Sequence, residues 1–210
     1  MQKALSILAQ ICSIILHPLL MPTYGIILFF MDAIKVYENI PTSFQFAAIA
    51  GTALITLVIP AVIIFTLWKT KRIDSLHIDK AEQRTKPYAY TIVAYIFWMY
   101  FIMVILQLPM LIITISICAI MTLLAVIVIN RIWKISAHLT GIGGLLGGIC
   151  TYALYAENIP YSLMFWVLML ALVLMYARLY LNAHSPLQVV GGFLLGLFCV
   201  FLPNLLLIYA

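Results

Sequence analysis

The sequence predicts an all-α protein, a polytopic membrane helix bundle of about six or seven spans. Two observations lead to this prediction. First, 66% of the 210 residues are hydrophobic and 8% are charged, whereas soluble domains carry about 45–50% apolar and about 25% charged residues. Second, the apolar residues come in long runs, and a helix needs roughly 20 of them to cross a hydrocarbon core of about 30 Å.

The first apolar stretch, residues 4–31, is interrupted by His17 and Pro18. Because proline removes a backbone donor and breaks a helix, we expect an interfacial helix up to Leu16, followed by a broken or short first span. A cleavable signal peptide with Lys3 as its basic region is the rival interpretation, but no small-x-small cleavage site follows. The sequence thus predicts a break near residue 17.

Each of the remaining apolar segments predicts one helix, because backbone groups in lipid must bond within their own segment and a closed barrel would show alternation instead. Short turns with Pro41, Pro109 and Pro160 separate several of them, since proline suits the start of a helix. The predicted segments are 44–68, 88–107, 109–130, 138–156, 160–181 and 187–208.

Nearly all basic residues are predicted to lie at one membrane face. Alternating spans put the connections 69–87, 131–137 and 182–186 on the same side, and of the Lys and Arg residues only Lys35 falls opposite. The positive-inside rule explains most of this excess, but we expect three or four of these bases also to bind a ligand. The residues on this face are Lys3, Lys69, Lys71, Arg72, Lys80, Arg84, Lys86, Arg131, Lys134 and Arg178.

The connection 182–186 carries the strongest functional signal. Ser185 is a good N-cap and Pro186 fits the first helical position, so the last span is predicted to start just after His184. Exposed N–H groups and the helix dipole favour an anion such as phosphate at this place. Arg178, at the end of the preceding span, can reach the same anion with a bidentate fork.

A second histidine, His138, has a similar place, since it follows Ser136 at the start of another span. Both helices also have small residues four positions apart, a pattern that lets membrane helices approach closely. We therefore expect His138 and His184 to be neighbours in space. The patterns are Gly143-x-x-x-Gly147, Gly144-x-x-x-Gly148 and Gly192-x-x-x-Gly196.

A third segment, residues 79–87, is basic and opens the span 88–107. If it is helical, Lys80 and Arg84 share a face at i, i+4 spacing, and Lys86 follows closely. Bases, two histidines and helix N-termini together predict a phosphate site. Because this polar site lies at a membrane surface, its substrate is expected to be amphipathic.

These three segments resemble, in order, the signature motifs of the type 2 phosphatidic acid phosphatase family, which are Lys-x6-Arg-Pro, Pro-Ser-Gly-His and Ser-Arg-x5-His-x3-Asp. The third motif agrees best, with Arg178-x5-His184 preceded by Ala177 in place of the Ser. The second is Ile-Ser-Ala-His at 135–138, and the first, within 80–87, has a different spacing. The resemblance covers roughly residues 80 to 200.

The resemblance implies a metal-independent phosphatase that needs no organic cofactor. His184 would be the nucleophile that forms a phosphohistidine, and His138 the acid to the leaving group. Histidine titrates near neutral pH, so it can attack in one state and donate a proton in the other. The implied phosphate-binding residues are Arg178, Arg84, Lys80, Ser136 and Lys86.

The sequence departs from the family at Gln188, where the family has the Asp that orients and electrostatically supports the nucleophile. A Gln oxygen can accept an imidazole N–H and fix the tautomer, but it brings no negative charge. Gln188 also stands three residues after Ser185, where it can complete a capping box. We hypothesise an active enzyme with an altered pH dependence, and an inactive one is the alternative.

The implied substrate is a lipid-linked phosphate or diphosphate of the phosphatidic acid, phosphatidylglycerophosphate or polyprenyl diphosphate type. The expected partners are this substrate and membrane lipids, with no nucleic acid. We expect one membrane domain over 1–210, with N-terminal helices in 1–68 and a phosphatase-like core in 69–210. The alternative from another class is a non-catalytic lipid-phosphate-binding protein or transporter of the same fold.

The remaining histidines are assigned no role in the site. His17 and His77 lack a basic partner at a telling spacing and are expected to be interfacial or solvated. The four histidines form no i, i+4 pair and no carboxylate accompanies them, so no metal site is predicted. The expected location is the bacterial inner membrane. Charge bias places the active-site face in the cytoplasm, whereas analogy with the family places it in the periplasm.

Overall fold

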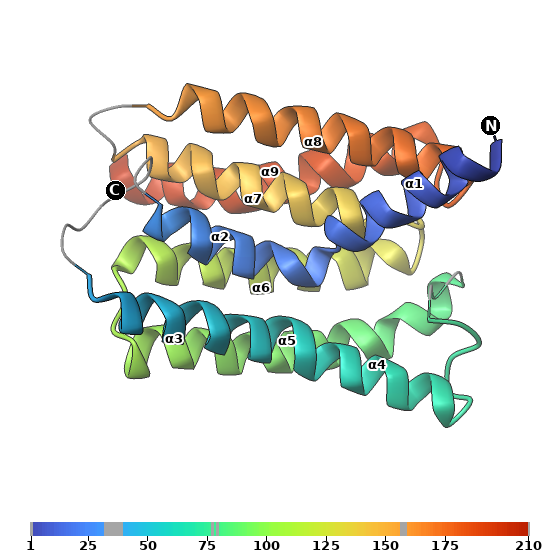
Figure 1. The fold of residues 1–210 in the computed structure, drawn as a ribbon, viewed down its shortest axis with the longest axis horizontal. Coiled ribbons are helices and arrows are strands. Elements are labelled where there is room, and N and C mark those ends of the chain that lie inside the picture. Colours follow the sequence, from blue (N-terminus) through green and yellow to red (C-terminus); the bar gives the residue numbers. More distant parts are fainter. Residues whose placement is uncertain (1, 32–39, 77, 79, 156–158, 210) are drawn as a thin grey trace.

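The computed structural model describes residues 2–31, 40–76, 78, 80–155 and 159–209. The regular elements of these residues are all helices, and most of them run side by side in one bundle (Figure 1). The predicted all-α fold is therefore confirmed. The helices are α1 (Gln2–Ile15), α2 (Met21–Phe30), α3 (Thr42–Ala53), α4 (Ile59–Lys69), α5 (Thr85–Tyr100), α6 (Met110–Asn130), α7 (Ala137–Ala153), α8 (Tyr161–Tyr180) and α9 (Pro186–Tyr209).

Six helical stretches of the described residues are long and apolar enough to cross a membrane. α7, with 17 residues, is shorter than these but runs beside them through the bundle (Figure 1). The protein is an integral membrane protein, and the prediction of six or seven spans is confirmed. The six stretches are Gln2–Phe30, Thr42–Lys69, Glu82–Ile105, Met110–Asn130, Tyr161–Tyr180 and Pro186–Leu207.

Two of the spans contain a π-helical turn. Leu54–Val58 joins α3 to α4, and Phe101–Ile105 continues α5. Successive spans run in opposite directions, so the connections after α4, α6 and α8 meet at the end of the bundle where the N-terminus lies (Figure 1). Lys3 lies in the first turn of α1 at this same end, and the other basic residues predicted for this face lie in these connections or in the adjoining helical turns.

The first span breaks where the sequence predicts. α1 ends at Ile15, and a 3₁₀ turn over Pro18–Leu20 leads into α2. Pro18 has no N–H to continue the helical ladder. α1 packs against α8 and forms one long apolar stretch with α2. The expectation that α1 is an interfacial helix stays a prediction.

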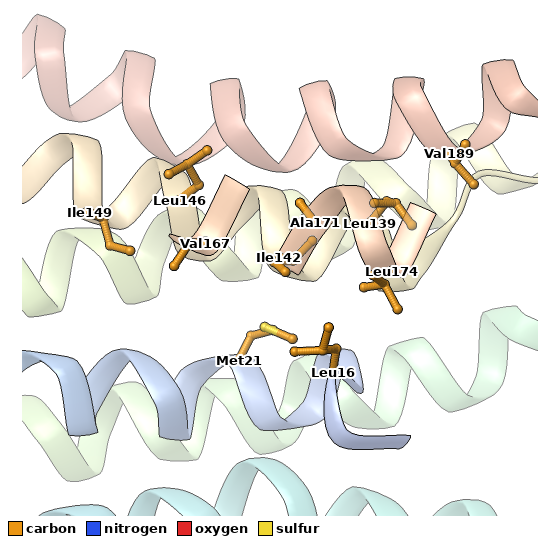
Figure 2. Close-up of a cluster of buried hydrophobic side chains, with 10 residues drawn as sticks. All are labelled: Leu16, Met21, Leu139, Ile142, Leu146, Ile149, Val167, Ala171, Leu174 and Val189. Atoms are coloured by element: carbon orange, nitrogen blue, oxygen red, sulfur yellow. The ribbon is translucent and has the colours of Figure 1, made fainter. Parts of the chain in front are cut away.

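A core of buried side chains holds the broken first span against α7, α8 and α9 (Figure 2). Four of these side chains recur at helical spacing along one face of α7. Because α7 carries His138, this core fixes the position of that histidine relative to the first span. The buried residues are Leu16, Met21, Leu139, Ile142, Leu146, Ile149, Val167, Ala171, Leu174 and Val189.

The predicted close approach of α7 and α9 is confirmed. A Cβ atom added at Gly147 would lie 2.6 Å from the carbonyl oxygen of Leu197, and one at Gly192 would lie 2.6 Å from that of Ser136. Real Cβ atoms do not come so close to backbone, so only glycine fits at these positions. The glycines whose added Cβ would overlap the backbone of the other helix are Gly143, Gly147, Gly192 and Gly196.

Candidate active site

A cavity of about 260 Å³ lies between α2, α5, α6 and α7, with its polar end among the basic connections. The rest of its lining is mostly apolar and extends along the helices towards the opposite end of the bundle. The polar end therefore joins segments that are far apart in the sequence. The charged and imidazole side chains that line it are His17, Arg84, His138, Arg178 and His184.

His184 lies directly before α9 and is 9% exposed. Its Nδ1 lies 3.2 Å from Oε1 of Gln188, and the backbone N–H of Ser185 donates to the same oxygen at 3.1 Å. A backbone N–H requires an acceptor, so this atom of Gln188 is the carbonyl oxygen and His184 Nδ1 is the donor. His184 Nε2 consequently keeps its lone pair. The same Gln188 oxygen caps α9 and orients the imidazole.

The environment of His184 keeps its imidazole neutral at pH 7. Burial is the largest cause that lowers the pKa of His184 to about 4. The positive charges of Arg84, Arg178 and Lys134 act in the same direction, whereas the hydrogen bond to Gln188 opposes them. A neutral imidazole with a free Nε2 has the protonation state that a nucleophile needs.

His138 is held by the end of α1. Its Nε2 lies 3.2 Å from the carbonyl oxygen of Ser13. A carbonyl oxygen only accepts, so His138 Nε2 carries the proton and Nδ1 is left to exchange one. The Ser13 carbonyl is free of the α1 ladder because the N–H of His17, four residues on, bonds to Ile14 instead at 3.3 Å.

Two arginines bring positive charge to the cavity. Arg84, 6% exposed, donates from Nε to the carbonyl of Ile78 at 2.8 Å and from Nη1 to that of Ile135 at 3.3 Å. Arg178 donates from Nη1 to the hydroxyl of Ser13 at 3.3 Å. No Asp or Glu is among the described residues that line the cavity. The guanidinium groups therefore favour an anion at its polar end.

Three predicted phosphate-binding residues do not line the cavity. Lys80 precedes a 3₁₀ turn, so it shares no α-helical face with Arg84, and it pairs instead with Asp74 at 2.6 Å. The hydrogen bond and charge of Asp74 raise the pKa of Lys80. Lys86 is exposed, and Ser136 is fully buried where α7 meets α9.

His17 lines the cavity, so the alternative that it is solvated is wrong, whereas its interfacial position stays a prediction. Its ring centroid lies 5.2 Å from that of His138, with the two planes at 81°. The turn between α1 and α2 packs against α7, which encloses the imidazole. A polar residue before a proline inside an apolar span is the signal that indicates such a site. His77 lies outside the described residues.

Residues 114–207 match the model of the PAP2 superfamily. The chain contains a PAP2 superfamily domain. It includes the second and third motifs, whereas the N-terminal helices and the first basic segment precede it. Searches of curated proteins and of solved structures gave no significant match.

The PAP2 domain alone does not complete the polar end of the cavity. Arg84 lies before the matched residues, and its hydrogen bond to Ile135 ties it to the loop that precedes α7. Ser13 and His17 also come from outside the PAP2 domain. The PAP2 superfamily is a phosphatase family. Each of the three predicted motifs contributes a residue to this cavity, namely Arg84, His138, and Arg178 with His184.

Proposed function

We propose that the protein is a metal-independent phosphatase that hydrolyses a lipid-linked phosphate or diphosphate through a phosphohistidine on His184. The observation that carries this proposal is the cavity itself. It has imidazole and guanidinium groups at one end and an apolar lining along the rest. An amphipathic substrate with an anionic head matches this division.

The first chemical step is attack of His184 Nε2 on phosphorus. The bound phosphate anion favours the imidazolium form of His138, with protons on both ring nitrogens. The nitrogen–phosphorus bond forms as the bond from phosphorus to the leaving oxygen breaks, and this imidazolium gives that oxygen its Nδ1 proton, while Nε2–H stays on the Ser13 carbonyl. In the second step, a water molecule gives a proton to His138 and its oxygen attacks the phosphohistidine. Inorganic phosphate leaves, and both histidines return to their starting states.

The arginines support this reaction electrostatically. Phosphoryl transfer depends mainly on positioning and on stabilisation of charge that spreads over the phosphoryl oxygens. Arg84 and Arg178 are fixed by hydrogen bonds to other parts of the site, so little reorganisation is needed when the phosphoryl group arrives. Gln188 holds the reactive tautomer of His184.

The apolar part of the cavity supports a lipid substrate. On α7, Tyr152 lines the cavity about four turns beyond His138, which is about 21 Å at a rise of about 1.5 Å per residue. Trp98 and Leu123 line the same region from α5 and α6. A hydrocarbon tail placed there would extend along α7 from a head group at the histidines. Phosphatidic acid, phosphatidylglycerophosphate and polyprenyl diphosphate all have this form.

Phosphate release from these three lipids by the purified protein in detergent tests the proposal. The wild type is expected to release phosphate equally with and without EDTA. His184→Ala is expected to lose activity by about a thousandfold or more, since it removes the nucleophile. Arg131→Ala, which removes an exposed base outside the cavity, is the matched control and is expected to retain activity. A His184→Ala protein as active as the wild type would exclude the phosphohistidine.

Gln188 supports the alternative function, a non-catalytic lipid-phosphate binder or transporter. A neutral amide brings no negative charge to stabilise an imidazolium or a phosphohistidine. An inactive wild type that binds lipid phosphate, beside an active Gln188→Asp variant, would favour this alternative. Phosphate release by the wild type itself would exclude it.

We infer that the active-site face lies in the cytoplasm of a bacterial cell. The support is the charge bias, because without Lys80, Arg84 and Arg178 this face still holds seven of the remaining eight Lys and Arg residues. A Ser75→Cys variant is expected to react with a membrane-impermeant maleimide only in lysed cells. Labelling in intact cells would place the site in the periplasm. The wild type is the control, since none of its four cysteines is fully exposed.

A further inference from the structure

The broken first span brings irregular backbone to the polar end of the cavity. Between Ile15 and Met21 the chain leaves the α-helix, within a stretch long and apolar enough to span the membrane. Non-helical backbone at membrane depth is tolerated where it is buried in protein or lines a cavity. Here Ser13, at the end of α1, contacts both His138 and Arg178. The break thus lies against the proposed catalytic groups.

His17 is fixed in one tautomer by the turn that follows it. It is the N-cap of the 3₁₀ turn, and its Nδ1 accepts the backbone N–H of Leu19 at 3.3 Å. An acceptor nitrogen uses its lone pair, so the proton of the neutral imidazole is on Nε2. His17 therefore has a donor left over after it has capped the turn.

The ring of His17, which carries this Nε2–H donor, lies at the polar end of the cavity. It packs edge to face against His138, and both rings line the polar end of the cavity together with Arg178 and His184. A phosphoryl group that reaches His184 and His138 therefore lies in the same enclosed space as His17.

We propose that His17 is a phosphate-binding residue, a third imidazole that donates its Nε2–H to a phosphoryl oxygen. This inference rests on the proposed function for its substrate and adds a residue from outside the PAP2 domain. The two arginines supply positive charge, and His17 supplies a neutral donor whose direction the turn fixes. A fixed donor needs no reorganisation when charge develops on the phosphoryl oxygens.

Two substitutions separate this role from a purely structural one. His17→Asn keeps an acceptor at the place of Nδ1 for the Leu19 N–H, but it has no group at the place of Nε2. His17→Gln carries an amide nitrogen near the place of Nε2 but no acceptor near Nδ1. The Asn variant therefore preserves the cap, and the Gln variant preserves the donor.

We expect kcat for phosphatidic acid in mixed micelles to fall about a hundredfold or more in His17→Asn and less than about tenfold in His17→Gln. The melting temperature is expected to fall by a few degrees in His17→Gln, which loses the cap, and to stay close to the wild-type value in His17→Asn. The reverse order of activities would overturn the proposal and leave His17 as a cap.

Binding of inorganic phosphate, measured by calorimetry on the purified protein, separates this inference from the proposed function. The Kd for phosphate is expected to rise at least tenfold in His17→Asn and to change little in His17→Gln. This pattern in a wild type that hydrolyses no lipid phosphate would support His17 and exclude the phosphatase. Unchanged binding and unchanged turnover in His17→Asn would exclude His17 and leave the phosphatase standing.

Discussion

The two faces of α7 carry glycines at the same spacing, yet one face is closed and the other borders the cavity. On the α9 side, a Cβ added at Gly147 would lie 2.6 Å from a backbone oxygen. On the cavity side, a Cβ added at Gly148 would meet a methyl group of Ile115 at 3.6 Å, which is ordinary contact. Of these two adjacent glycines, Gly147 thus leaves no space for a side chain, whereas Gly148 leaves space for a methyl group.

The difference comes from the facing helix. α9 presents Gly192 and Gly196 to α7, so backbone meets backbone and no space is left. On the other side α6 presents the branched side chain of Ile115, which holds the helices further apart. Glycine spacing therefore indicates that another helix can approach closely. The residues of the facing helix decide whether a tight contact or a cavity results.

The largest effect is expected from Gly147→Ala. Its new Cβ would overlap the Leu197 carbonyl, and backbone cannot rotate away as a side chain can. Overpacking of this kind costs about 1–3 kcal/mol, and it would separate the helices that carry His138 and His184. Thermal unfolding in detergent measures the loss. Gly148→Ala is the matched control, and its free energy of unfolding is expected to change by less than about 0.5 kcal/mol. Equal melting temperatures for the two variants would contradict the tight contact between α7 and α9.

A smaller effect is expected from filling the cavity. Gly144 lines it about six residues beyond His138, or about 9 Å along α7. Gly144→Leu is expected to lower kcat/KM at least tenfold for a long-chain phosphatidic acid, about 1.4 kcal/mol, and to change it little for a dihexanoyl analogue.

Gly148→Leu, one turn deeper at about 15 Å, is the control and is expected to affect only the longer tails. Assays across a series of chain lengths measure both variants. An equal loss on all chain lengths would mean that the tail does not occupy the cavity.

The smallest effect is expected from Gln188→Asp, on the pH dependence of activity. His184 must be neutral to attack, and its pKa of about 4 keeps it neutral above that value. The kcat/KM of the wild type is therefore expected to fall only as the pH approaches 4, because His184 becomes protonated there and is no longer a nucleophile. A carboxylate in Gln188→Asp stabilises the imidazolium and raises the pKa, so the acid limb moves to higher pH by about one unit or more.

The substrate ionises identically in both proteins, so the difference between their pH profiles reports on His184. Gln188→Leu, which removes the hydrogen bond without adding charge, is the control and is expected to shift the limb in the opposite direction. Coincident profiles for the wild type and Gln188→Asp would mean that another group sets the acid limb.

Local signals in the sequence were sufficient for several parts of the site. Ser185 and Pro186 predict the start of α9 and hence the place of His184, because capping involves only neighbouring residues. Pro18 likewise predicts the break after α1. The role of that break could not be predicted, because the enclosure of His17 depends on α7, more than a hundred residues further along the chain.

The sequence by itself determined the helical spans and the end of the bundle at which the bases gather, because backbone in lipid must bond within its own segment and charged groups avoid the hydrocarbon. Only the tertiary structure decided which bases face the cavity. Arg84 and Lys80 are four residues apart, yet Arg84 turns inward to Ile135 and Lys80 outward to Asp74. The direction of each side chain depends on partners from other segments, and these become neighbours only when the helices pack.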